Sequence, residues 1–376
     1  MQNLIHSRKQ STDGMISDGN HKKVLMAGRT SARIAKEAKE EERTVMNKSK
    51  IEWTDFTWNP VTGCLHGCHY CYAAKQARRF SGDVRLNKGS DQLQKDEDSL
   101  YILEKPFKNQ VGKVIPDPVG FEPIMHRYRL SMPAQKKKPA KIFVVSMGDL
   151  FGAWVPDNWI EEVFKACDAA PWHTYMFLTK NPRRYMELAE KGILRVADNF
   201  WYGSTATTSE TEFFWHDQLN TFVSIEPIQA PFPDALDPDC GIQKVKWVII
   251  GAETGNQKRK AVPEKDWIRT IVKACWATKT PVFLKDNLKK VWGEDLIQEW
   301  PKGMPMDKGN DVPQCRECEH CEITSEGKRG NRHHCKKEDR HVLGRYARTS
   351  PPWCPLRREE TAHEKAKKKK GGIIQC

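Results

Sequence analysis

The chain has 376 residues, 38% of them hydrophobic and 30% charged, which is enough for one large domain or two to three smaller ones. No stretch approaches the roughly 20 apolar residues of a membrane helix, and the N-terminus lacks the apolar core of a secretory signal. These patterns argue against a membrane-embedded or secreted protein. We therefore expect a cytoplasmic protein with no membrane partner.

The net charge of +13 is concentrated at the two ends of the chain. Residues 1–45 carry nine Lys or Arg against six Asp or Glu, and residues 301–376 carry 18 against 11. Basic ends of this kind could supply weak, salt-sensitive affinity for nucleic acid. The middle of the chain, by contrast, need not itself be a polyanion-binding surface.

Residues 1–45 are polar and poorly patterned, which predicts a disordered or loosely helical basic extension. A strand-then-helix rhythm follows over residues 46–300. Seven runs have the length and flanks of strands: Thr54–Asn59, Ile142–Ser146, Tyr175–Thr179, Trp201–Ser204, Phe222–Ile225, Val245–Gly251 and Pro281–Lys285. Four helices are expected at Tyr72–Phe80, Asn158–Ala169, Arg183–Lys191 and Glu264–Ala277.

Strands that alternate with helices predict an α/β fold with a parallel sheet, and seven strands suit a partial or full barrel better than a small open sheet. The interval between Asn199 and Phe222 has room for only one short helix. Residues 85–140 are rich in proline and predict an irregular, lid-like insertion. Beyond residue 300 we expect a linker at 301–313, a cysteine-rich metal module at 314–356 and a basic tail at 357–376.

The first cysteine group, Cys64, Cys68 and Cys71, has the spacing C-x3-C-x2-C. Three thiolates on one short loop can converge on a single metal centre. A 4Fe-4S cluster normally takes four cysteines, so three would leave one iron open to bind the amino and carboxylate groups of S-adenosylmethionine. Two alternatives remain, which are inert thiols and a zinc site completed by His66 or His69.

The cysteine spacing, the strand before the loop and Tyr70 before the third cysteine resemble the radical S-adenosylmethionine (radical SAM) superfamily. The sequence around these residues is similar to a phage and bacterial family of unknown function within that superfamily. Seven segments carry that resemblance: Ser49–Asp55, Trp58–Cys64, Cys71–Ala73, Ser146–Phe151, Leu178–Lys180, Ser224–Pro227 and Gly251–Gly255. The resemblance implies a partial (β/α)6 barrel with the cluster at its mouth. It also implies reductive cleavage of S-adenosylmethionine to a 5′-deoxyadenosyl radical, driven by a reductant such as flavodoxin or ferredoxin.

Polar residues follow nearly every predicted strand, and in α/β barrels functional groups sit at the carboxyl ends of the strands. The resemblance gives some of them cofactor-binding roles: Tyr70 against the adenine, Ser146 and Asp149 at the methionine amino group, Ser204 or Thr205 at the ribose, and Ile249 and Glu253 near the adenine. The segment Ser146–Asp149 departs from the Gly-Gly-Glu-like turn that is usual at its position.

Three strand-end residues, Lys180, Glu226 and Lys285, are candidates for substrate binding or for proton handling in the radical step. The alternative is that Glu226 simply forms a buried ion pair with a nearby lysine.

The second cysteine group offers five ligands: Cys315, Cys318, Cys321, Cys335 and Cys354. A zinc ion would use four of them, with either Cys321 or Cys315 spare, and nearby histidines could substitute. An auxiliary 4Fe-4S cluster is the other possibility.

Taken together, these patterns predict a radical SAM enzyme whose substrate is nucleic acid or a nucleotide, with a peptide or protein as the second choice. The alternative from another class is a non-enzymatic zinc-dependent DNA-binding protein that uses both cysteine groups.

Overall fold

The computed structural model describes residues 46–237, 240–254, 261–293, 295–304, 321–325, 332–336, 339–342 and 371–375. The chain divides into two compact units, residues 1–45 and 46–376, and every described element belongs to the second. The predicted extension at 1–45 lies outside the described residues. No helix in the described part of the chain is both long and apolar enough to span a membrane.

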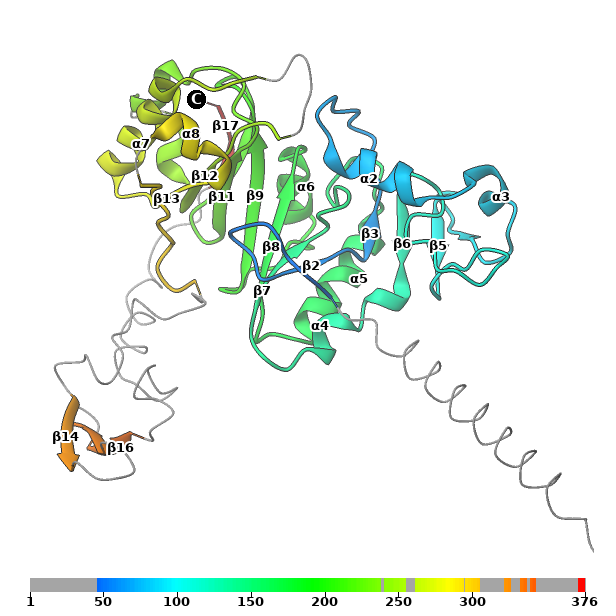
Figure 1. Cartoon of the computed structure of the whole chain (residues 1–376), viewed down its shortest axis with the longest axis horizontal. Coiled ribbons are helices and arrows are strands. Elements are labelled where there is room, and N and C mark those ends of the chain that lie inside the picture. The colour runs from blue at the N-terminus through cyan, green and yellow to red at the C-terminus, as the bar shows by residue number, and fades with distance from the viewer. Residues whose placement is uncertain are drawn as a thin grey trace, which may run out of the picture. The chain divides into compact units, whose positions relative to one another are not determined.

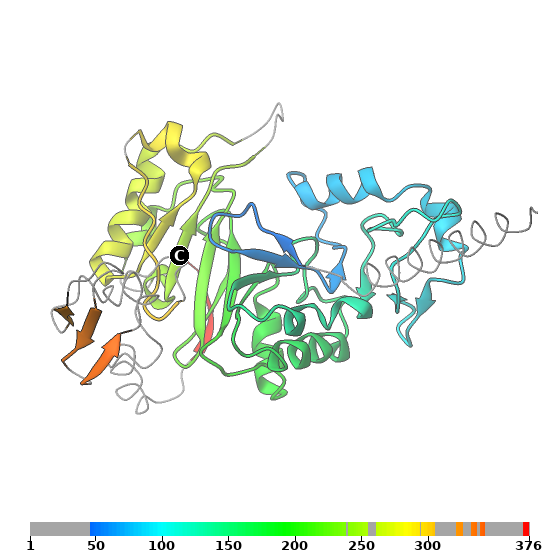
Figure 2. The same cartoon turned by 60° about the horizontal axis from the view of Figure 1, so that its bottom comes forward.

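The largest sheet has eight strands in the order β1-β2-β7-β8-β9-β11-β12-β13 (Figures 1 and 2). β1 (Asn47–Lys48) runs antiparallel to β2 (Phe56–Trp58), and every later pair is parallel. The later strands are β7 (Lys141–Val144), β8 (Thr174–Thr179), β9 (Phe200–Ala206), β11 (Asn220–Ile225), β12 (Trp247–Ile250) and β13 (Val282–Leu284). All seven predicted strands are present and follow chain order, so the predicted parallel α/β sheet is confirmed.

Helices α2 (Tyr72–Phe80), α5 (Asp157–Asp168), α6 (Arg183–Glu190) and α7 (Lys265–Thr278) lie where helices were predicted. The interval between β9 and β11, which has room for only one short helix, instead contains strand β10 (Phe213–His216). Its consecutive aromatic residues favour a strand, and it pairs antiparallel with β17 (Gly371–Ile374), for which the sequence predicted no element.

The two faces of the large sheet carry different cores because side chains alternate along each strand. On one face, strand residues pack with α5 and α6 and, farther along the sheet, with α7. On the other face lies an aromatic core that contains no residue from a described helix. Its strand residues and flanking aromatics include Trp53, Phe143, Trp201, Phe222, Trp247, Phe283 and Trp300. The helices therefore cover one face, and the aromatic inner face leads toward the strand ends.

The segment at 85–140 contains short elements that the expectation of an irregular insertion did not include. A four-stranded sheet has the order β3-β6-β5-β4, and a small core of its own packs beside it. Its strands are β3 (Val61–Thr62), β4 (Gln94–Lys95), β5 (Tyr101–Leu103) and β6 (Ile124–His126), and its helices are α3 (Val84–Lys88) and α4 (Met132–Gln135). Because β3 pairs with β6, the insertion is tied to the start of the first cysteine loop.

Several shorter elements complete the described structure. They are α8 (Lys289–Trp292) and four 3-10 helices at Arg127–Arg129, Pro233–Leu236, Gly241–Lys244 and Asp286–Leu288. In the predicted metal module, β14 (Cys321–Ser325), β15 (Arg332–Cys335) and β16 (Arg340–Val342) form an antiparallel sheet in which Cys321 lies opposite Cys335. Cys315, Cys318 and Cys354 lie outside the described residues.

Candidate functional site

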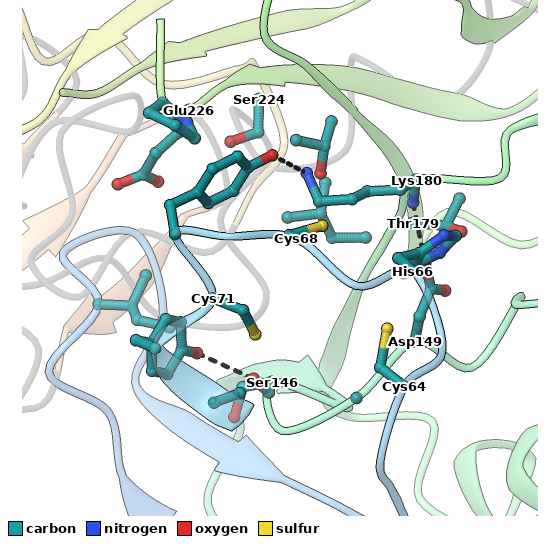
Figure 3. Close-up of a pocket in the computed structure, with 18 of the residues that line it drawn as sticks. Cys64, His66, Cys68, Cys71, Ser146, Asp149, Thr179, Lys180, Ser224 and Glu226 are labelled. Atoms are coloured by element: carbon teal, nitrogen blue, oxygen red, sulfur yellow. Dashed lines mark hydrogen bonds and ion pairs between the residues drawn. The ribbon is translucent and has the colours of Figure 1, made fainter. Parts of the chain in front are cut away.

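A cavity of about 280 Å³ opens at the edge where the parallel strands end. Figure 3 shows the three cysteines and the labelled strand-end side chains arranged around this space, with Ser146 and Asp149 beside the cysteines. The lining includes most of the predicted site residues: Cys64, Cys68, Cys71, Tyr70, Ser146, Asp149, Lys180, Thr205, Glu226, Glu253 and Lys285.

The period of two along the strands explains which side chains reach the cavity. Ser224 and Glu226 follow the inner-face residue Phe222 by two and four positions. Lys285 follows Phe283 in the same way, and both strands supply cavity-lining residues. Because side chains two apart share a face, the cavity continues the aromatic inner core beyond the strand ends.

The first cysteine loop runs from β3 to α2, and its three thiols are half-buried, free and directed toward the same space (Figure 3). The sulfur of Cys71 caps α2 by accepting a hydrogen bond from Ala74 N at 3.3 Å. Burial raises the pKa of the Cys64 thiol to about 12, so metal binding there must displace a proton. Among the described residues, no three His, Cys, Asp or Glu side chains are grouped to hold a single metal ion.

Backbone contacts at two glycines fix the start of this loop. Gly63 N donates to Met147 O at 2.9 Å, and a Cβ on Gly148 would lie 2.7 Å from Gly63 O. Gly63 itself has a φ of +90°, and a Cβ there would collide with the backbone of Glu122. The loop is thus held between the insertion and the segment after β7, at a closeness that only glycine permits.

The carboxylate of Asp149 fastens the same loop to the ends of β7 and β8. Its Oδ2 accepts hydrogen bonds from Thr179 Oγ1 and from Lys180 N, both at 3.0 Å. The same oxygen lies 2.8 Å from His66 Nε2, and Oδ1 accepts from Phe151 N at 3.0 Å. With four partners and 4% exposure, this carboxylate is engaged in positioning the loop. Its predicted role at the methionine amino group stays a prediction.

A lysine ammonium lies beside the cysteine loop. Lys180 Nζ donates to Tyr70 Oη at 3.0 Å and lies 5.2 Å from the centre of that ring. Burial lowers the pKa of Lys180, while the neighbouring cysteines act in the opposite direction, and burial also raises the pKa of Tyr70. The pair therefore places a cation and a phenol next to the thiols.

At the ends of β11 and β13, Glu226 and Lys285 form the ion pair that was the alternative to a catalytic role. Lys285 Nζ donates to Glu226 Oε1 at 2.6 Å and lies 3.6 Å from Glu52 Oε2. A Cβ on Gly251 would come within 3.0 Å of both partners, so the glycine makes room for the pair. The ion pair is confirmed, and the roles of both residues in substrate binding or in proton handling stay predictions.

Three buried polar atoms of the lining have no hydrogen-bond partner within the described part of the chain. One is the indole Nε1 of Trp53, and the other two are Ser224 Oγ and Glu253 Oε1, on residues only 1% and 3% exposed. The other oxygen of Glu253 accepts a long hydrogen bond from Ala261 N at 3.4 Å. Because buried polar atoms are normally paired, these atoms mark places where a bound molecule would find partners.

Two of the predicted cofactor-binding residues do not line the cavity. Ser204 Oγ accepts a hydrogen bond from Phe214 N at 2.9 Å, and Ile249 belongs to the aromatic core. Of the two ribose candidates, only Thr205 reaches the cavity, since it shares its face with Trp201. Ser146 lines the cavity, but its hydroxyl already donates to Asn59 Oδ1 at 3.2 Å.

Sequence reasoning gave no site role to Ser224, Thr179 or Tyr72, and it treated His66 only as a zinc ligand. The signal for Ser224 was its place two residues after Phe222, within a segment that carried the family resemblance. Tyr72 follows the third cysteine directly, and its hydroxyl donates to Ser146 O at 2.8 Å. The anchoring role of Thr179 depends on a contact that sequence spacing does not reveal.

Comparison with known proteins adds a family and one remote structural likeness. No curated protein matches the sequence. A solved structure of a spore photoproduct lyase mutant, with bound AdoMet and dinucleoside spore photoproduct, is similar over 64% of this chain and 79% of its own, at a TM-score of 0.39 and 9% identity. Residues 48–351 match the family described as "Protein of unknown function (DUF5131)". This match spans most of the sequence, and the chain belongs to the DUF5131 family.

Proposed function

We propose that this chain is a radical SAM enzyme in which Cys64, Cys68 and Cys71 hold a 4Fe-4S cluster. The observation that carries the proposal is that all three thiols, from one loop, face a single cavity at the carboxyl edge of a parallel sheet. Three thiolates leave one iron of such a cluster for the amino and carboxylate groups of S-adenosylmethionine. When bound and reduced, the cluster supplies the electron that cleaves the sulfonium bond and releases a 5′-deoxyadenosyl radical.

The chain's own residues fit this group in two respects. The glycine contacts and the carboxylate of Asp149 hold the loop rigidly, which a cluster bound by three cysteines of one loop requires. Elsewhere in the lining, Ser224 Oγ and Glu253 Oε1 are available for hydroxyl or amino groups of a nucleoside. A loop that held only zinc would need neither of these wall residues.

We also propose that the large sheet is a partial (β/α)6 barrel. The strands follow chain order, and α5, α6 and α7 pack against one face while an aromatic core fills the other. A doubly wound sheet would instead carry helices on both faces. One-sided helices with an inner core are the arrangement of a barrel.

Anaerobic purification and metal analysis test the function directly. The intact protein should be brown, contain about four irons per chain at the first site, and form 5′-deoxyadenosine from S-adenosylmethionine and dithionite. Replacing Cys64, Cys68 and Cys71 with Ala should abolish both the cluster and the product. Cys167→Ala removes a buried free thiol outside the cavity and is the matched control. A colourless protein that contains only zinc would refute the proposal.

A further inference from the structure

The two helices that follow the cysteine loop carry a strongly basic surface. Residues 72–88 contain five basic residues and one acidic residue, Asp83. The Asp83 carboxylate accepts hydrogen bonds from the backbone N–H groups that begin α3, and Lys88 pairs with Glu122 at 2.5 Å. Four further cations are exposed and have no ion-pair partner among the described residues: Lys75, Arg78, Arg79 and Arg85.

The exposed cations of α2 start next to the cavity. Helix α2 buries only Ala73 and Ala77, so its remaining side chains are largely free to face solvent. Tyr72, Lys75 and Arg79 are spaced at i, i+3 and i+7 and therefore lie on one face of the helix. Tyr72 lines the cavity, and Arg79 lies about 10 Å farther along the helix axis. Figure 1 shows α2 leading from the cysteine loop toward α3.

Exposed apolar side chains lie among these cations. Phe80 is 48% exposed and Leu86 is 55% exposed. The guanidinium of Arg79 lies 5.6 Å from the centre of the Phe80 ring. Cations bind phosphates and an exposed ring stacks on bases, so a nucleic acid would use both kinds of side chain, whereas a strongly acidic polypeptide would engage mainly the cations. The composition therefore favours nucleic acid over an acidic polypeptide.

We propose that this α2–α3 surface, formed by Lys75, Arg78, Arg79, Phe80, Arg85 and Leu86, binds the backbone of a single-stranded nucleic acid and presents one of its nucleotides to the cavity. A base held outside a duplex can enter a pocket, which a stacked base cannot. The role in substrate delivery rests on the proposed radical SAM function. The binding itself does not require the cluster.

Oligonucleotide binding by the anaerobically purified full chain tests the surface. Fluorescence anisotropy with a labelled single-stranded oligonucleotide is measured over a salt series. The double variant Lys75→Gln/Arg79→Gln should bind about tenfold more weakly near 0.15 M salt, with a salt slope lower by about 1.4, because each lost phosphate contact on a single strand removes about 0.7. The variant Lys165→Gln/Lys273→Gln removes equal charge from exposed positions on α5 and α7 and should bind normally.

A crosslinking experiment locates the contact independently of the basic ends of the chain. An oligonucleotide with 5-iodouracil should crosslink within the peptide that contains residues 72–88. Phe80→Ala should remove that crosslink, whereas Trp276→Ala, which deletes a ring 55% exposed on α7, should not. Unchanged binding by the double variant, crosslinks only elsewhere, or equal competition by polyglutamate would each overturn the proposal. Formation of 5′-deoxyadenosine without substrate reports separately on the cluster, so the two proposals can fail independently.

Discussion

Gly148 and Asp149, adjacent residues after β7, position the cysteine loop by opposite means. Gly148 does so by lacking a side chain, which lets two backbone segments touch, and Asp149 does so through a fully engaged carboxylate. Neither residue offers a free group to a cofactor. The sequence correctly placed Asp149 in the site, but only the structure shows that its carboxylate binds residues of the cysteine loop and of β8.

Gly148→Ala should displace Cys64 and impair cluster assembly. The added Cβ would lie 2.7 Å from Gly63 O, and a backbone atom cannot move aside without moving the loop. We expect most of the iron to be lost, with a loss of stability of about 1–3 kcal/mol from overpacking. Iron analysis and urea denaturation measure the two effects. Gly89→Ala is the control, because its added Cβ would lie 3.5 Å from the nearest atom. A Gly148→Ala protein with its full iron content would contradict this role of Gly148.

His126→Gln should reduce the acid sensitivity of folding. His126 is fully buried, and burial, aided by Arg129, holds its pKa well below the usual value of 6.5. Below about pH 6.5 the unfolded chain binds a proton that the folded chain does not. This residue therefore lowers the free energy of unfolding by up to about 1.4 kcal/mol per pH unit as pH falls.

Urea denaturation of the metal-free protein between pH 7.5 and 5 checks this expectation. The wild-type and His126→Gln curves should run parallel above about pH 7.5, where the histidine is neutral in both states. Below pH 6.5 the variant should lose stability less steeply. Parallel curves over the whole range would show that His126 does not cause the acid sensitivity.

At the scale of elements, the helices and strands that could be predicted were those with a clear hydrophobic pattern. The buried strands and long helices could be predicted from their hydrophobic patterns. In β7, for example, Ile142, Phe143 and Val144 form a continuous apolar run because both faces of the sheet are buried. The insertion's strands of two or three residues show no period and were missed. Strand β17 was missed because its partner β10 lies more than 150 residues away, and such pairing leaves no local signal.

Strand β17 should contribute measurably to stability although it lies within the predicted basic tail. Ile373 and Ile374 pack against the cores on either side of β10, and Ile374 also approaches Gly241. Replacing both isoleucines with Ala should lower the free energy of unfolding by about 2–4 kcal/mol. It should also speed amide exchange in Phe213–His216, measured by mass spectrometry. Gln375→Ala, at an exposed position, is the control, and equal effects of the two changes would argue against docking of β17.

For the whole molecule, the net charge of a sequence region does not show where its surface is basic. The middle of the chain is only weakly basic, which suggested that it need not bind a polyanion. Its charges are nevertheless segregated: most basic residues of α5 and α6 have carboxylate partners, such as Arg184 with Asp157, whereas those of α2 do not among the described residues. Charge that is balanced over a region can still be unbalanced on one surface, and only the fold shows where.

The second cysteine group should behave as a metal site separate from the first. Cys321 and Cys335 lie directly opposite one another in the β14–β15 pair, where opposed Cβ atoms are about 5 Å apart, a separation that suits two thiolates on one centre. We expect Cys321→Ala/Cys335→Ala to lose a second metal while the first cluster and 5′-deoxyadenosine formation persist. The triple variant at Cys64, Cys68 and Cys71 should show the reverse. Metal analysis of both variants would identify the second centre, since loss of about one zinc per chain indicates a zinc site and loss of about four irons an auxiliary cluster. Joint loss of all metal in either variant would mean that the two groups depend on each other, and no loss from Cys321→Ala/Cys335→Ala would exclude this pair as ligands.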